Sequence, residues 1–293
     1  MYDLRFVSDT GKELVLNYDS GIVVGKVDGA TGMTVTQKTA QGYKQVGVTI
    51  SALTVGGRDL LISGFIFEEN AQKKQELIST FAPFVTGRLY WEDRYWIDVA
   101  VKNAPTVYQE KDSRFSMRLF AADPYFRSTE QNTAQNGITT NMFSFPLIFS
   151  GTTIGTDRPH QFGVQSTSGT FNVPNNGQAE TPFDLEIEGT VDITSPQLTD
   201  SATGAFLLWN GTIAVGEKLR IWSESGRIRA TLTDTNDEVT NVLGLIDDDS
   251  TLFSLPVGDN ILEATAETAE QTAAMRTTIS YYTLYSGVLM NGV

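Results

Sequence analysis

A chain of 293 residues with a formal charge of −14, one histidine and no cysteine is long enough for two hydrophobic cores. The absence of cysteine excludes disulfides, thiolate metal sites and thiol nucleophiles. The acidic excess argues against nucleic-acid binding, because phosphate recognition needs basic groups.

The first part of the chain is rich in strand and turn patterns. VSDTGKELVLNY predicts a hairpin around residues 9–12. Further turns are expected at Asp28-Gly29 and at Gly56-Gly57, between short runs of apolar and β-branched residues. These patterns predict a sheet built from short strands.

One segment of this part, ENAQKKQELISTFAPF, has the spacing of a helix. Asn70 is placed to cap its first turn, and Pro83 is expected to end it. Leu77, Ile78 and Phe81 form the apolar stripe that we expect to face the core.

After the helix, GRLYWEDRYWIDVAV predicts a hairpin that turns at Glu92-Asp93, with an aromatic cluster packed across its strands. The next strand, FSMRLFA, alternates in the period of a half-buried strand and ends at Asp123-Pro124. An acid at a strand end is a candidate general base, but Asp before Pro is also a common turn starter. The turn is favoured, because no basic or histidine partner lies near Asp123 in the sequence.

RSTEQNTAQNGITT, residues 127–140, is polar and has no apolar period, so it predicts a linker. About eight strand-like segments of even spacing follow, which is typical of a β-sandwich or jelly roll. The charge changes at the same place: residues 1–128 carry 15 basic and 15 acidic residues, and residues 129–293 carry 6 and 20. We therefore predict a mainly β fold with an α+β domain over 1–128 and a β-sandwich over 129–293.

The patterns that would indicate catalysis are weak. His160 lies in a loop-like segment without a nucleophile elbow, and no glycine loop for phosphates precedes a helix. Asp234-x-Asn236-x-Glu238 begins like a calcium loop, but the glycine and final glutamate of such a loop are missing. We predict no enzyme activity, no cofactor and no metal site.

Neither a signal peptide nor a membrane-spanning helix is expected, because the apolar runs are too short.

Two tryptophans remain as candidates for stacking on a sugar. Trp209 and Trp222 both lie in alternating strands, so a place in the core fits them equally well.

Taken in order, several segments resemble the distal tail proteins (Dit-like) of phages and prophages with long non-contractile tails. The first-half segments are GRDLLISGFI, the helix running to FAPF, GRLYWEDRYWIDVAV and FAADPYF. NNGQAETPFDLEIEG, GEKLRIWSESGRI, STLFSLPVGDN and YSGV follow in the second half. The resemblance covers nearly the whole chain and depends on the order of these segments.

This resemblance implies a structural virion protein of the phage tail tip, assembled in the cytoplasm of the bacterial host. The N-terminal domain of such proteins forms a hexameric ring below the tail tube, and a galectin-like β-sandwich follows it. The ring joins the tube protein to a hub or fibre protein of the baseplate and, in many phages, to receptor-binding proteins for host attachment. Genome DNA passes through the ring without specific binding.

Two expectations follow for this chain. Exposed edges and hairpin tips are natural pairing sites, so the turns at Asp28, Gly29, Gly56 and Gly57 are the candidates for the ring interface. The alternative function is a carbohydrate-binding adhesion module that uses Trp209 or Trp222.

Overall fold

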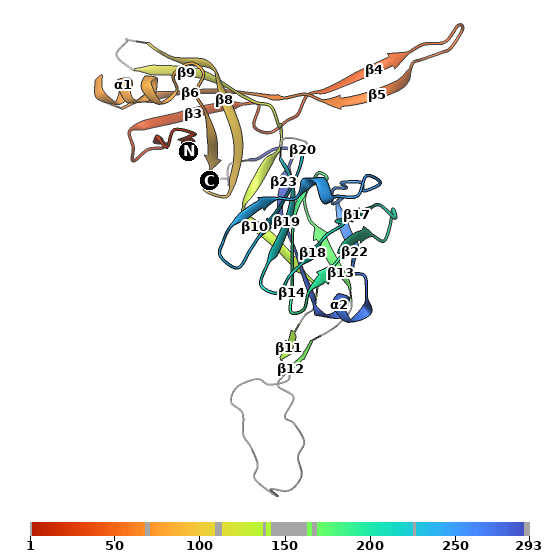
Figure 1. Cartoon of the computed structure of the whole chain (residues 1–293). Coiled ribbons are helices and arrows are strands. Elements are labelled where there is room, and N and C mark those ends of the chain that lie inside the picture. The colour runs from red at the N-terminus through yellow and green to blue at the C-terminus, as the bar shows by residue number, and fades with distance from the viewer. Residues whose placement is uncertain are drawn as a thin grey trace, which may run out of the picture. The chain divides into compact units, whose positions relative to one another are not determined.

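The structure is a computed structural model that describes residues 2–67, 71–108, 113–136, 139–141, 163–165, 169–224 and 227–289. Strands dominate the described residues, so the predicted mainly β fold is confirmed (Figure 1). The chain forms two compact units. The first unit comprises residues 1–130, 177–179 and 282–293, and the second comprises 131–176 and 180–281.

The first unit is a strongly bent antiparallel sheet with one helix and one long hairpin. Its elements are β1 (Leu4–Ser8), β2 (Glu13–Leu16), β3 (Ile22–Asp28), β4 (Val35–Ala40), β5 (Thr49–Val55), β6 (Arg58–Ile66), α1 (Ala71–Thr80), β7 (Thr86–Trp91), β8 (Tyr95–Val107) and β9 (Arg114–Ala121). The start of β10 (Phe126–Gln135) and the end of β23 (Met275–Tyr285) complete it. The 13-residue strand β8 pairs with β7 and with β9, so it connects β2-β1-β7 to β9-β6-β3.

The two hairpins that were predicted from their own turn residues are present in the structure. β1 pairs with β2 across residues 9–12, and β7 pairs with β8 across Glu92-Asp93. Both Glu92 and Asp93 have positive φ angles, 51° and 48°, as a tight hairpin turn requires. The turns at Asp28-Gly29 and Gly56-Gly57 also exist, but the strands that flank each do not pair with each other: β3 pairs with β6, and β4 with β5.

Helix α1 covers part of the first core. Leu77 and Phe81 are buried as predicted, but Ile78 is 40% exposed, so its assignment to the buried stripe was wrong. The predicted cap, Asn70, lies outside the described residues. The core itself includes Phe6, Trp91 and Phe126 with the inward residues of the strands.

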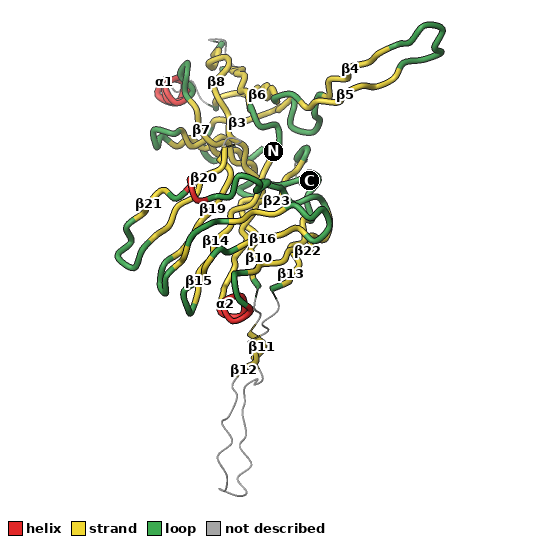
Figure 2. Tube along the Cα trace, turned by 45° about the vertical axis from the view of Figure 1, so that its right-hand side comes forward, coloured by secondary structure: helices red, strands yellow, loops and turns green. Residues whose placement is uncertain are grey.

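The second unit has two antiparallel sheets around one core (Figure 2). One sheet runs β10-β23-β14-β19-β20-β21 and the other runs β13-β22-β16-β17. The new strands of the first sheet are β14 (Phe183–Gly189), β19 (Lys218–Glu224), β20 (Arg227–Thr233) and β21 (Val239–Asn241). Those of the second are β13 (Thr170–Asn175), β16 (Gln197–Asp200), β17 (Phe206–Leu208) and β22 (Gly258–Thr265).

Small elements complete this unit. They are β11 (Thr139–Asn141), β12 (Gly163–Gln165), β15 (Ile193–Thr194), β18 (Thr212–Ile213), the 3-10 helix η1 (Leu243–Leu245) and the helix α2 (Ala269–Ala274). Helix α2 was not predicted, although Thr268 caps it by accepting the backbone N–H of Gln271, which is half of a capping box. No helix among the described residues is long and apolar enough to cross a membrane.

The polar segment that predicted a linker is a strand for most of its length. Residues 126–135 form β10, which pairs with β8 through Arg127 and Ser128 and then runs beside β23. Most of its side chains after Phe126 lie at the surface, so the segment shows no apolar period. The prediction of a linker here was wrong because a strand with little to bury has the composition of a loop.

The break at Asp123-Pro124 is structural. The Asp123 carboxylate accepts the backbone N–H of Tyr125 and forms an ion pair with Arg127, so the expectation that no basic partner lies near it in the sequence was wrong. Phe126 is fully buried in the first core. The Pro124 carbonyl accepts the Nε–H of Arg58 at 2.7 Å. Asp123 is therefore part of the turn that starts β10.

Arg58 of this unit is only 4% exposed and has no carboxylate partner among the residues that the structure describes. Its Nη1 donates to the carbonyls of Gly29 and Ala30 at 2.8 and 2.9 Å, and Nη2 donates to that of Ser286. The guanidinium also lies 4.9 Å from the centre of the Phe126 ring. Burial lowers the pKa of Arg58, and the four carbonyls compensate for the lost water.

We predict that Arg58→Met destabilises the protein by about 2–4 kcal/mol, because it leaves four inward-facing carbonyls without donors. Urea unfolding followed by circular dichroism measures the change. Arg118→Met, an exposed arginine of β9, is the matched control and is expected to change stability by less than about 0.5 kcal/mol. Equal effects of the two variants would contradict the role of Arg58.

Candidate assembly surface

The strands β4 and β5 form a hairpin that extends away from the rest of the first unit; we call residues 35–55 the arm (Figures 1 and 2). Its strands pair only with each other, from Val35 opposite Val55 to Ala40 opposite Thr49. All residues of the arm are exposed. Both edges of the ribbon are therefore open to pairing or packing with another surface.

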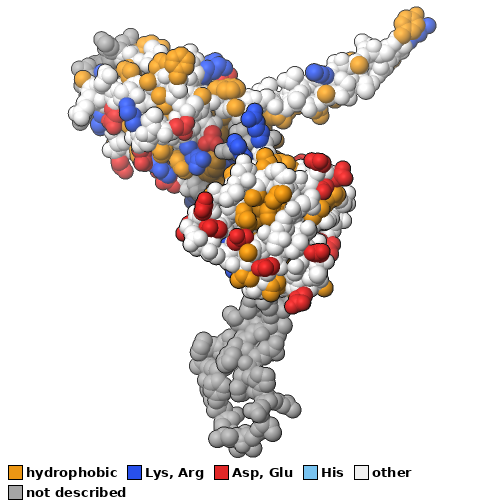
Figure 3. Space-filling view, viewed as in Figure 1, with side chains coloured by type: hydrophobic (Ala, Val, Ile, Leu, Met, Phe, Trp, Pro, Cys, Tyr) orange, Lys and Arg blue, Asp and Glu red, His pale blue; other side chains and the backbone are white. Residues whose placement is uncertain are grey.

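The composition of the arm is unlike that of a solvated loop. Its exposed apolar residues are Val35, Tyr43, Val46, Val48, Ile50, Leu53 and Val55. Tyr43 and Val46 at the tip are 93% and 101% exposed. The only charged residues of the arm are Lys38 and Lys44, and Figure 3 shows apolar and basic side chains along it. A ribbon with this surface is suited to a protein contact.

The tip has a defined conformation although it is exposed. The Gln45 side chain accepts the backbone N–H of Gly42 and donates to Thr49 Oγ1, both at 2.9 Å. Lys44 and Gly47 have positive φ angles of 59° and 86°. The tip therefore presents Tyr43 and Val46 from an ordered turn.

The turns predicted as ring interface lie at the two ends of the segment that carries the arm. Gly29 has a φ of 91°, and a Cβ there would lie 2.1 Å from the Asp59 carbonyl oxygen. A Cβ on Gly57 would lie 2.4 Å from the Phe120 ring. These close approaches explain both glycines within one chain; whether Asp28, Gly29, Gly56 and Gly57 also contact another copy stays a prediction.

A second exposed apolar feature follows helix α1. Phe84 is 98% exposed and has a φ of 69°, a conformation that is strained for a residue with a Cβ. Pro83 beside it is also exposed. Nothing in the core of this unit requires a phenylalanine there, so Phe84 is a candidate contact residue. FAPF was predicted only as a helix end, although an aromatic residue directly after the terminating proline was a usable signal.

The two tryptophans predicted for sugar contact have different environments. Trp209 is 1% exposed in the second core, and its Nε1 donates to the Val242 carbonyl at 3.3 Å. Trp209 cannot stack on a ligand, so this prediction was wrong for it. Trp222 is half-buried on the outer face of β19, with the Arg220 guanidinium 4.7 Å from its ring centre.

The remaining candidates for chemistry do not form a centre. The Asp234 carboxylate accepts the backbone N–H groups of Glu238 and Asn236, both at 2.8 Å, and these bonds lower its pKa. His160 lies outside the described residues. Within the part of the chain that the structure describes, no three His, Cys, Asp or Glu side chains are placed to bind a metal ion together.

Comparisons with known proteins identify the class of the second unit. Residues 176–285 match the family model of the siphovirus-type tail component, C-terminal domain. This part of the chain is therefore similar to the C-terminal domain of siphovirus-type tail components, and the resemblance to phage distal tail proteins is confirmed. No curated protein sequence gives a match.

Solved structures extend the likeness to the whole fold. The crystal structure of SPP1 Dit (gp 19.1), described as a paradigm of the hub adsorption apparatus in Gram-positive infecting phages, is 12% identical, with a TM-score of 0.67 over 96% of this chain and 98% of that one. A chain of the phage P2 baseplate in its activated conformation with Ca is 10% identical, with a TM-score of 0.52 over 98% of this chain and 100% of that one. Both parts of this chain thus have the fold of phage tail proteins.

We predict that Phe84→Asn raises the free energy of unfolding by about 0.5–1 kcal/mol, because asparagine tolerates the left-handed conformation better than phenylalanine does. Urea unfolding of the unassembled chain measures the effect. Phe84→Ala keeps the strain and removes only the exposed ring, so it is the control and is expected to be close to neutral. A destabilising Phe84→Asn would mean that the ring stabilises the fold itself.

Proposed function

We propose that this chain is the distal tail protein of a phage or prophage with a long non-contractile tail. Copies of the first unit assemble into a hexameric ring at the end of the tail tube. The ring links the tube protein to the hub or fibre protein of the baseplate and takes part in host attachment. The protein is then a virion component made in the cytoplasm of the host, and its role is structural and non-enzymatic.

The observation that carries this proposal is the arm. An isolated two-stranded hairpin is only marginally stable in water, and a long exposed edge invites pairing with other chains. The arm has these properties and adds seven exposed apolar side chains to them. A second copy of the chain is the occupant that we favour, because repeated contact of one surface patch with a different patch on the next copy closes into a ring.

Charge supports contacts between copies. The arm carries two lysines and no acid, whereas the whole chain carries −14. Residues 1–128 are neutral, so copies of the first part meet without large repulsion, and the basic arm is attracted to an acidic neighbour. The turns at Asp28-Gly29 and Gly56-Gly57, which flank the arm segment, are proposed to lie at the same interface.

The comparisons with solved structures support a location of this ring in the baseplate of a phage tail. SPP1 Dit is described as a paradigm of a hub adsorption apparatus, and the phage P2 chain belongs to a baseplate. By analogy, we propose the tube protein and the hub protein as partners, with receptor-binding proteins as further ones. The galectin-like character of the second unit and the passage of DNA through the ring are part of the same proposal.

The oligomeric state tests the proposal. We expect the purified chain, alone or with its tail tube protein, to have about six times the mass of one chain by light scattering and to appear as rings by negative-stain microscopy. Replacing residues 35–55 by a short Gly-Ser turn is expected to abolish the rings. The same replacement leaves the unfolding midpoint of the monomer unchanged, because the arm buries no side chain in either core.

A matched control separates the arm from general surface hydrophobicity. Tyr43→Ser combined with Val46→Ser removes two apolar groups from the arm tip, and Val239→Ser combined with Leu243→Ser removes two exposed ones from the second unit. The first pair is expected to weaken assembly at least tenfold and the second pair to leave it unchanged. A chain that stays monomeric with and without the tube protein would refute the ring.

A further inference from the structure

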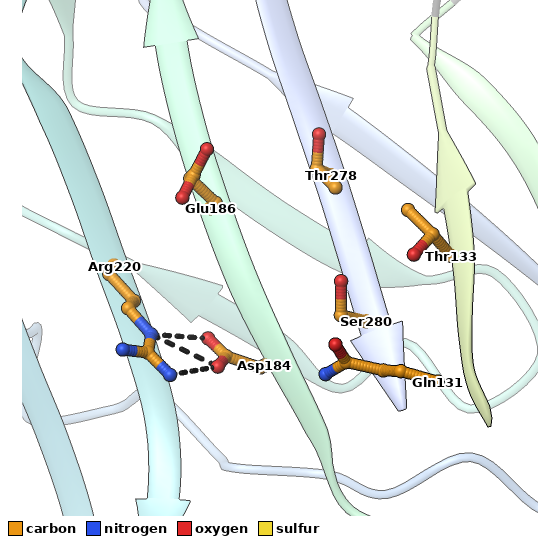
Figure 4. Close-up of a pocket in the computed structure, with 7 residues that line it drawn as sticks. All are labelled: Gln131, Thr133, Asp184, Glu186, Arg220, Thr278 and Ser280. Carbon is orange, nitrogen blue, oxygen red and sulfur yellow. Dashed lines mark hydrogen bonds and ion pairs between the residues drawn. The ribbon is translucent and has the colours of Figure 1, made fainter. Parts of the chain in front are cut away.

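The outer face of the first sheet of the second unit contains a polar hollow of about 400 Å³ (Figure 4). It is lined by Gln131 and Thr133 of β10, Asp184 and Glu186 of β14, Arg220 of β19, and Thr278 and Ser280 of β23. Register places them side by side: Asp184 is opposite Ser280, and Glu186 is opposite both Thr278 and Arg220. The alternate residues of the same strands, such as Leu185 and Ile279, are buried in the core.

One side of the hollow is formed by an ion pair and the other side by hydroxyl and amide groups. Arg220 Nε donates to both carboxylate oxygens of Asp184 at 3.0 Å, and Nη2 donates to the same carboxylate. This ion pair raises the pKa of Arg220 and fixes both side chains. On the other side lie the hydroxyl groups of Thr133, Thr278 and Ser280 and the amide of Gln131 (Figure 4). These side chains make no hydrogen bond within the described residues. Their donors and acceptors are available to a ligand.

The charges in the hollow decide which ligands fit. Arg220 is neutralised by Asp184, and Glu186 leaves a negative balance that Lys218, 3.5 Å away, offsets only in part. An anionic ligand such as a phosphate or a uronic acid is therefore disfavoured. The polar lining also disfavours an apolar ligand, since sites for such ligands are mostly lined by apolar side chains. What remains is a neutral, hydroxyl-rich molecule.

Trp222 lies on the same face of the sheet but is not among the residues that line the hollow. Trp222 follows Arg220 by two residues on the same face of β19 and is opposite Asp184. Its ring is half-buried, and the fixed Arg220 guanidinium packs on it. The guanidinium covers one face of the Trp222 ring, so recognition of a sugar depends on the hydroxyl, amide and carboxylate groups of the hollow.

We propose that this hollow binds a neutral saccharide of the host surface. Thr278, Ser280, Thr133 and Gln131 donate and accept hydrogen bonds with its hydroxyl groups. Glu186 accepts a hydrogen bond from a further hydroxyl group. Assembly of many copies would convert weak single sites into firm attachment by multivalency. The proposal does not depend on the number of copies in the ring, because each copy contains all the residues of the hollow.

Calorimetry and saturation-transfer NMR on the full chain test the site with cellobiose, lactose, maltose and chitobiose. We expect at least one of these neutral disaccharides to bind with a roughly millimolar dissociation constant. Galacturonic acid and glycerol 3-phosphate are the anionic comparators and are expected to bind at least tenfold more weakly. Stronger binding of either anion, or no binding of any neutral disaccharide, would overturn the proposal.

Variants locate the binding. Thr278→Arg fills the hollow from its outer face and is expected to weaken binding at least tenfold, whereas Ser280→Ala and Gln131→Ala remove single groups and are expected to weaken it about threefold. Thr240→Arg adds the same side chain on the exposed strand β21, outside the hollow, and is the matched control. Equal binding by Thr278→Arg and Thr240→Arg would show that the sugar binds elsewhere and would refute the site.

Discussion

The first unit depends on one buried cation that has no anion. Arg58 begins β6, and its guanidinium donates to carbonyls from three separate segments: the turn after β3, the turn before β10, and the residue after β23. Burial of a guanidinium without hydrogen-bond partners costs several kcal/mol of folding free energy. These three segments must therefore keep their carbonyls directed at Arg58. The constraint fixes the first and last parts of the chain to each other across 228 residues.

The same constraint explains how the arm can be long and still be well placed. The arm leaves the fold after Ala30 and returns at Arg58, and the Gly29 and Ala30 carbonyls accept hydrogen bonds from that arginine. Both ends of the arm segment are therefore tied at one point, although no residue of the arm itself is buried. A ribbon that is fixed at its base and apolar along its length loses less conformational entropy on binding than a free loop does.

The sequence predicted the elements whose causes are local. The β1–β2 and β7–β8 hairpins follow from their turn residues and alternation. The burial of Leu77 in α1 and of Phe81 directly after it follows from helical spacing. The pairing of β3 with β6 could not be predicted, because the arm separates these strands in the sequence. The role of Arg58 was also out of reach, since its partners are backbone carbonyls, which carry no residue signature. Trp209 was a candidate only because alternation does not say which face of a strand is inside.

The clearest failures of the sequence reading coincide with the candidate surfaces. Residues 127–140 were predicted as a linker because their side chains are mostly polar, and the same polarity lets Gln131 and Thr133 of β10 line the hollow. The arm alternates like a half-buried strand from Val46 to Ala52, although neither of its faces meets a core. A strand that buries nothing in its own chain has to be stabilised by its neighbours in a sheet or by a partner. β10 is paired with β8 and lies beside β23, whereas β4 and β5 pair with each other alone. The arm is therefore the segment that needs a partner for its stability.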